Sequence, residues 1–99
     1  MPVETPSPDA LLAEIREQLA ALLETPLTPA DDERALAELA PDRYDSLGVL
    51  ECVGMVEQRF DIAVDLLADD LRTTFHSVAS IAALVERKRA DAAVLGFAP

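Results

Sequence analysis

Three stretches of this sequence repeat apolar residues at the three- and four-residue spacing of an amphipathic helix. They cover residues 9–24, 46–60 and 77–90. This spacing gathers apolar side chains on one face, which a helix must bury against another element. Aromatic residues make up only 4% of the chain and tryptophan is absent, so the core must be built from aliphatic side chains. The sequence therefore predicts an all-α fold of packed helices rather than a β-sandwich.

Each of the three helices has its own predicted apolar face. The first consists of Leu11, Leu12, Ile15, Leu19, Leu22 and Leu23. The second consists of Leu47, Leu50, Val53, Val56 and Phe60. The third consists of Val78, Ile81, Ala82 and Val85, with Leu84 at its flank and the basic residues Arg87, Lys88 and Arg89 near its end. Positive charge near a helix C-terminus interacts favourably with the helix dipole, so the basic cluster is expected to cap this helix.

The connections between these helices are marked by prolines and acidic residues. Two prolines in residues 25–29 end the first helix, because proline cannot continue it. Residues 30–40 begin with acidic residues and are followed by a proline, which predicts a short helix. A further helical turn or two is expected over residues 66–71, and a loop over residues 72–76, where Phe75 plugs the core.

The 99 residues are enough for a single domain with one modest core. Residues 1–8 contain three prolines and no apolar periodicity, which is typical of a flexible leader. Residues 9–90 form the helical domain. Residues 91–99 form a C-terminal tail that extends the last helix, docks on the domain or stays loose. The expected architecture is a four-helix bundle with three long helices and one short helix, and with a long loop between helices one and two.

The net charge of −11, from 19 acidic and 8 basic residues, disfavours nucleic acid, whose phosphates need a basic surface. It favours a basic protein partner, although a merely solvated acidic surface would have the same composition. No apolar run approaches the roughly 20 residues of a membrane span. A single cysteine, Cys52, excludes an intramolecular disulfide and is expected to be buried. We therefore expect a cytoplasmic monomer that binds neither nucleic acid nor membrane.

The helix over residues 46–60 begins at Asp45 or Ser46, because either side chain can accept a hydrogen bond from a free backbone N–H at a helix start. Ser46 is therefore expected to face solvent. A phosphate esterified to its hydroxyl would lie near those N–H groups and the positive end of the helix dipole. The alternative is that the Asp-Ser pair only caps the helix.

The sequence around Ser46 resembles that of an acyl carrier protein. The resemblance is carried by Asp45-Ser46-Leu47, the following Val49-Leu50-Glu51, and Glu57-Gln58-Arg59-Phe60-Asp61-Ile62, together with Ser77-Val78-Ala79-Ser80-Ile81 at the start of the last helix. It covers residues 9–89, most of the chain. It implies a bundle of the acyl-carrier type, with 4′-phosphopantetheine from coenzyme A attached to Ser46. The sequence departs from the family pattern at Pro41-Asp42-Arg43-Tyr44, because a glycine is usual shortly before the Asp-Ser pair.

The resemblance also implies that Asp45, Leu47 and Glu51 lie on the surface that partner enzymes read. Glu57 adds to this acidic face. Met55 is either a partly exposed apolar contact for partners or a core methionine. No catalytic residue and no metal ligand is expected, because the sole histidine, His76, has no partner in sequence that would make a nucleophile–base pair or a metal site.

Such a discrete, freestanding carrier is not itself an enzyme. A phosphopantetheinyl transferase would attach the arm, an acyl-loading enzyme or acyltransferase would load it, and a ketosynthase or other processing enzyme would use the thioester, in polyketide or related specialised biosynthesis. A peptidyl or aminoacyl carrier is an alternative, but those more often have Gly-Gly-x-Ser. A second alternative is an acidic helical adaptor that binds a basic partner without modification. A hydrolase is disfavoured because the Gly-x-Ser-x-Gly motif is absent.

Overall fold

The computed structural model describes residues 8–66 and 69–95. Every regular element in these residues is a helix and none is a strand, which confirms the predicted all-α class. The elements are α1 (Pro8–Leu23), a 3-10 helix η1 (Pro29–Asp31), α2 (Leu36–Leu39), α3 (Ser46–Phe60), α4 (Leu71–Thr74) and α5 (Val78–Leu95). The leader expected over residues 1–8 falls outside the described residues except for Pro8, which begins α1. None of the helices in the described segments has the length and apolarity needed to cross a lipid bilayer.

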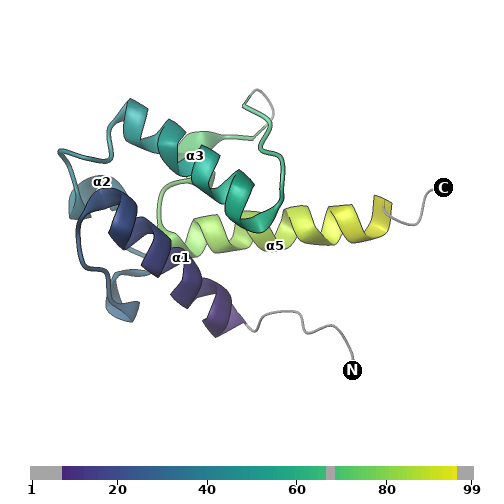
Figure 1. The fold of residues 1–99 in the computed structure, drawn as a ribbon, viewed down its shortest axis with the longest axis horizontal. Coiled ribbons are helices and arrows are strands. Elements are labelled where there is room, and N and C mark those ends of the chain that lie inside the picture. The colour runs from purple at the N-terminus through teal and green to yellow at the C-terminus, as the bar shows by residue number, and fades with distance from the viewer. Residues whose placement is uncertain (1–7, 67–68, 96–99) are drawn as a thin grey trace.

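The three long helices form the core. α1 packs against both α3 and α5, and α4 packs against α5. Figure 1 shows the last turns of α5 extending beyond α1 and α3. The core side chains repeat at helical spacing on each helix. They are Leu11, Ile15, Leu19 and Leu23 from α1, Cys52, Val53, Val56 and Phe60 from α3, and Val78, Ile81, Ala82, Leu84 and Val85 from α5. Leu84 is therefore fully buried rather than flanking, and Phe75 is buried among these side chains as expected.

The apolar face predicted for residues 46–60 is wrong at its first two members. Leu47 is 66% exposed and Leu50 is 50% exposed. Each three-residue step falls about 60° short of a full turn, so the series Leu47, Leu50, Val53 and Val56 rotates around the helix instead of keeping to one face. The buried stripe begins at Val49, which packs against the core, and continues through Cys52, Val56 and Phe60.

The single short helix expected over residues 30–40 is also wrong, because two shorter elements, η1 and α2, occupy that stretch. The carboxylate of Asp31 accepts hydrogen bonds from the Thr28 backbone N–H (2.9 Å) and hydroxyl (3.1 Å), which closes a tight turn. At Asp32, the carboxylate pairs with Arg16 at 2.7 Å and the carbonyl accepts from Ala79 N at 2.8 Å. These contacts with α1 and α5 replace the bonds that a continuous helix would need.

The short helix between α3 and α5 begins later than predicted. Within the described part of residues 66–71, helix begins only at Leu71, and α4 occupies most of the expected loop over residues 72–76. The reason is Asp70, whose carboxylate accepts from Arg72 N and from the Thr73 hydroxyl, both at 3.0 Å. Asp70 thus serves as the N-cap of α4 rather than lying inside a helix.

The last helix continues to Leu95, so it extends past residue 90 into the expected tail. Arg87, Lys88 and Arg89 consequently lie within α5 and do not cap its end. Lys88 Nζ lies 2.9 Å from a carboxylate oxygen of Asp69, and Arg87 lies 3.9 Å from the other. The Arg89 guanidinium lies 5.3 Å from the centre of the Phe60 ring. These contacts tie the end of α3 and the α3–α4 connection to α5.

Candidate functional site

Ser46 is the first residue of α3, and Asp45 is its N-cap. The Asp45 backbone is extended (φ −90°, ψ −168°), and its side chain accepts a hydrogen bond from Gly48 N at 2.9 Å. Ser46 is exposed, and its side chain has no hydrogen bond to any residue in the described segments. The expectation of a solvent-facing serine at a helix start is therefore confirmed, and its hydroxyl is available for chemistry because Asp45 performs the capping.

A tight turn fixes the backbone that leads into Ser46. Arg43 N and Tyr44 N both donate to Ala40 O, at 3.1 and 2.8 Å. The turn then packs directly on the first turn of α3, so that a Cβ at Gly48 would lie 2.0 Å from Arg43 O. Only glycine permits this approach. The sequence does not reveal this requirement, because it depends on where the Arg43 carbonyl lies in the folded chain.

Tyr44 is a second residue that the sequence analysis missed. Its side chain is buried, and its hydroxyl donates to Phe75 O at 2.5 Å. Burial raises the pKa of Tyr44 well above its usual range. A buried tyrosine usually has a partner for its hydroxyl, but the partner lies 31 residues away, too far for sequence spacing to identify it. This bond joins the turn before α3 to the residue that follows α4.

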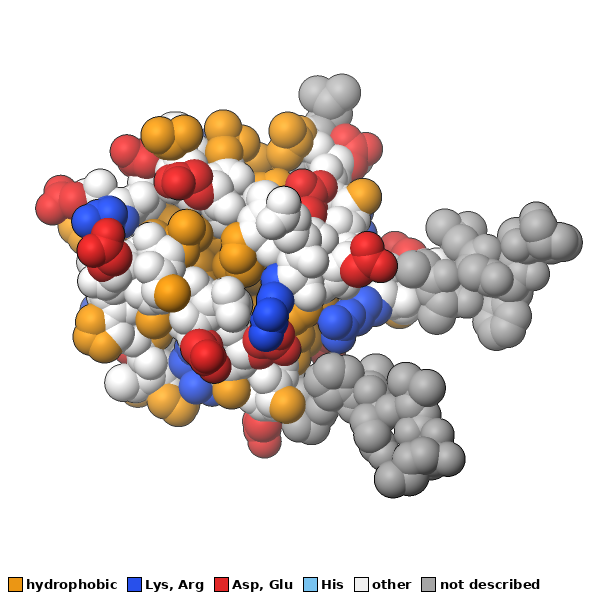
Figure 2. Space-filling view, in the orientation of Figure 1, with side chains coloured by type: hydrophobic (Ala, Val, Ile, Leu, Met, Phe, Trp, Pro, Cys, Tyr) orange, Lys and Arg blue, Asp and Glu red, His pale blue; other side chains and the backbone are white. Residues whose placement is uncertain are grey.

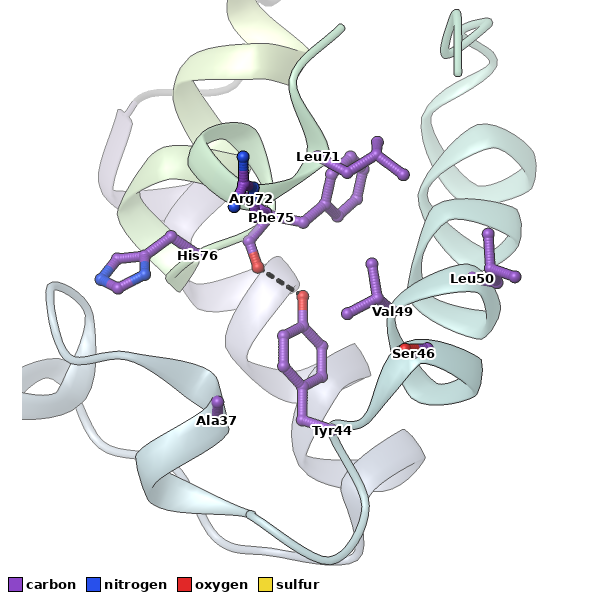
Figure 3. Close-up of a pocket in the computed structure, with 9 residues that line it drawn as sticks. All are labelled: Ala37, Tyr44, Ser46, Val49, Leu50, Leu71, Arg72, Phe75 and His76. Carbon is purple, nitrogen blue, oxygen red and sulfur yellow. Dashed lines mark hydrogen bonds between the residues drawn. The ribbon is translucent and has the colours of Figure 1, made fainter. Parts of the chain in front are cut away.

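A groove of about 440 Å³ lies beside Ser46. Its walls come from α2, the turn before α3, α3, α4 and the turn after α4 (Figure 3). The residues that line it are Ala37, Tyr44, Ser46, Val49, Leu50, Leu71, Arg72, Phe75 and His76. The hydrogen bond from Leu36 N to His76 O (2.9 Å) and the Tyr44–Phe75 bond hold these elements together. The walls are mostly apolar. Ser46 therefore borders both solvent and a groove that can accommodate part of a small molecule.

The surface of α3 around Ser46 combines apolar and acidic side chains. Leu47 and Leu50 are exposed, as are Asp45 and Glu51. Figure 2 shows hydrophobic and acidic side chains side by side over the region where α3 lies. The structure thus places Asp45, Leu47 and Glu51 together with Ser46 at one end of this helix.

The structure separates the two remaining predicted recognition residues from this end of α3. Met55 is half-buried and packs against the core. Glu57 is also half-buried, and its carboxylate accepts a hydrogen bond from Val64 N at 2.9 Å. Glu57 therefore holds the segment that follows α3 and does not present a free carboxylate beside Ser46.

Neither Cys52 nor His76 forms a catalytic pair with Ser46. Cys52 is fully buried as expected, and burial raises the pKa of its thiol to about 12. His76 is exposed and lies across the groove from Ser46, to which it makes no hydrogen bond. Within residues 8–66 and 69–95, no cluster of three or more His, Cys, Asp and Glu side chains could hold a metal ion.

None of the family models, curated proteins or solved structures compared with the chain matches it. Function is therefore inferred from the chemistry around Ser46.

Proposed function

We propose that this protein is an acyl carrier protein in which Ser46 carries 4′-phosphopantetheine. The observation that supports this most is the state of the Ser46 hydroxyl, which is exposed and makes no hydrogen bond to the described residues at the first position of a long helix. The Asp-Ser-Leu sequence at this place is the one that the resemblance to acyl carriers associates with the attachment site.

In the attachment reaction, the Ser46 oxygen attacks the coenzyme A phosphorus that is bonded to the pantetheine unit. The bond from that phosphorus to the second phosphate breaks, and 3′-phosphoadenosine 5′-phosphate leaves. The hydroxyl proton passes to a base of the transferase, because no histidine or carboxylate accepts a hydrogen bond from Ser46 in the described structure. The product is a phosphodiester at the start of α3, where the helix dipole stabilises a negative charge by about 0.3–1 kcal/mol.

The terminal thiol of the arm then holds an acyl group as a thioester, and the protein itself catalyses no step. Leu47 and Leu50 provide an apolar contact for the enzymes that attach, load and use the arm, and Asp45 and Glu51 provide charge that orients a basic docking surface. The same exposed surface supports one second candidate, an unmodified adaptor that binds a basic protein through Leu47, Leu50 and Glu51.

Incubation with coenzyme A and a promiscuous phosphopantetheinyl transferase distinguishes the two. The intact mass of the carrier should rise by one phosphopantetheine, and Ser46→Ala should abolish the gain. Ser7→Ala, which changes a serine elsewhere in the chain, should leave it intact. An unchanged mass under conditions that modify a control carrier would favour the adaptor.

A further inference from the structure

The groove beside Ser46 has apolar walls and polar groups at two opposite sides. Val49, Leu71 and Phe75 provide apolar wall, and the volume of about 440 Å³ lies within the range of roughly 300–1,000 Å³ that small-molecule pockets span. Ser46 borders the groove from α3. Arg72 and His76 border it from the opposite side, at α4 and the turn after it (Figure 3).

Arg72 differs from every other basic residue of the protein. All 8 lysine and arginine residues lie in the described segments. Seven have a carboxylate or aromatic partner: Arg16, Arg34, Arg43, Arg59, Arg87 and Lys88 form ion pairs, and Arg89 lies over the Phe60 ring. The Arg72 guanidinium forms no ion pair and no ring contact with the described residues, and its side chain interacts only through charge with the nearby Asp70 carboxylate. The neighbouring Asp70 carboxylate instead bonds to Arg72 N and the Thr73 hydroxyl.

We propose that the acyl unit carried by this protein ends in a carboxylate, which binds Arg72 across the groove from Ser46. This inference depends on the proposed attachment at Ser46. The phosphodiester of the arm is bonded to Ser46 itself and stays on the α3 side. The unit at the far end of the flexible arm is the part that can fold back, lay its methylene chain against Val49 and Phe75, and reach α4.

The chemistry of the site favours this occupant over a neutral acyl chain. A guanidinium presents paired N–H donors that match a carboxylate bidentately. A neutral chain of the same length would cover the apolar wall but leave the guanidinium without a directly bonded anion. Arg72 is thus a specificity-determining residue for cargo.

The test compares two cargoes of equal length. Hexanoyl- and adipyl-coenzyme A are used with a promiscuous transferase to load the full-length protein, and thioester hydrolysis is followed by intact mass. The adipyl thioester should hydrolyse about two- to five-fold more slowly than the hexanoyl thioester, in line with an exposed ion pair, and added salt should reduce the difference. In NMR spectra, the Arg72 side-chain N–H and the amide of His76 should shift with adipyl and not with hexanoyl.

Arg72→Gln should abolish the difference between the two cargoes, and Arg72→Lys should restore part of it. Arg34→Gln, which removes an exposed arginine outside the groove, should leave it unchanged. Since the Arg72 side chain is exposed and forms no hydrogen bond or ion pair in the described structure, circular dichroism should show both Arg72 variants folded.

Loading with equal hydrolysis of the two cargoes would overturn the inference and leave the carrier function standing. An Arg72 shift already present in the protein that bears only the bare arm would also overturn it, because Arg72 would then bind the phosphodiester. A protein that accepts no arm at all would refute the carrier function and the cargo inference together.

Discussion

Replacing Gly48 with alanine tests whether the turn before Ser46 packs as closely on α3 as the structure shows. The added Cβ would lie 2.0 Å from the Arg43 carbonyl oxygen and 3.0 Å from its carbon. Both atoms belong to the backbone, so no side chain can rotate away and the turn itself must move. Overpacking costs about 1–3 kcal/mol, and we expect the upper part of this range because the obstacle is backbone. Alanine recovers about 1 kcal/mol of helix propensity.

The expected net loss in the free energy of unfolding is therefore about 2 kcal/mol. With a urea m-value of about 1–3 kcal/mol/M, the denaturation midpoint should fall by roughly 1 M. Gly54→Ala is the matched control, because it makes the same change in the same helix where no atom lies within 4 Å of the new Cβ. It should raise stability by up to about 1 kcal/mol. Equal midpoints for the two variants, or a stabilised Gly48→Ala, would refute the close approach of Arg43.

Three further predictions concern buried and paired groups. Tyr44→Phe leaves the buried carbonyl of Phe75 without its partner and should cost about 1–3 kcal/mol, measured by urea denaturation; an unchanged midpoint would contradict the bond. Cys52 should resist alkylation at pH 8 in the native protein, because burial raises the pKa of its thiol to about 12, and should react in urea; stoichiometric native labelling would contradict this. The hydrogen bond from Lys88 lowers the pKa of Asp69 in the folded protein. The Asp69–Lys88 pair therefore stabilises the fold above the unfolded pKa of about 3.9, and this stabilisation is lost as the pH falls through the lower pKa of the folded state. Asp69→Asn should therefore reduce stability at pH 7 and make little difference near pH 2, whereas an equal loss at both values would exclude the charge as the cause.

The long helices could be predicted from sequence because their buried residues repeat along one helix. Leu11, Ile15 and Leu19 occupy one face through steps of four, and the structure buries all three. Leu47 and Leu50 could not be placed in this way, because steps of three rotate around the helix. Sequence spacing alone does not show at which residue α3 begins to contact the other helices.

The candidate site likewise has one part that the sequence predicts and another part that it does not. Ser46 and its position at a helix start follow from local capping chemistry, which depends only on neighbouring residues. The groove depends on contacts between distant segments, such as Tyr44 with Phe75 and Leu36 with His76. The absence of an ion pair between Arg72 and the described carboxylates likewise becomes visible only in the folded structure. The groove and the state of Arg72 therefore depend on packing between distant segments, which local sequence does not reveal.

The most direct test of the carrier function is peptide mapping after incubation with coenzyme A and a phosphopantetheinyl transferase. Tryptic cleavage after Arg43 and Arg59 releases a peptide in which Ser46 is the only serine. The account predicts that this peptide gains one phosphopantetheine and that fragment ions place it on Ser46. An unmodified peptide, or a gain located on any other residue, would contradict the assignment of Ser46 as the attachment site.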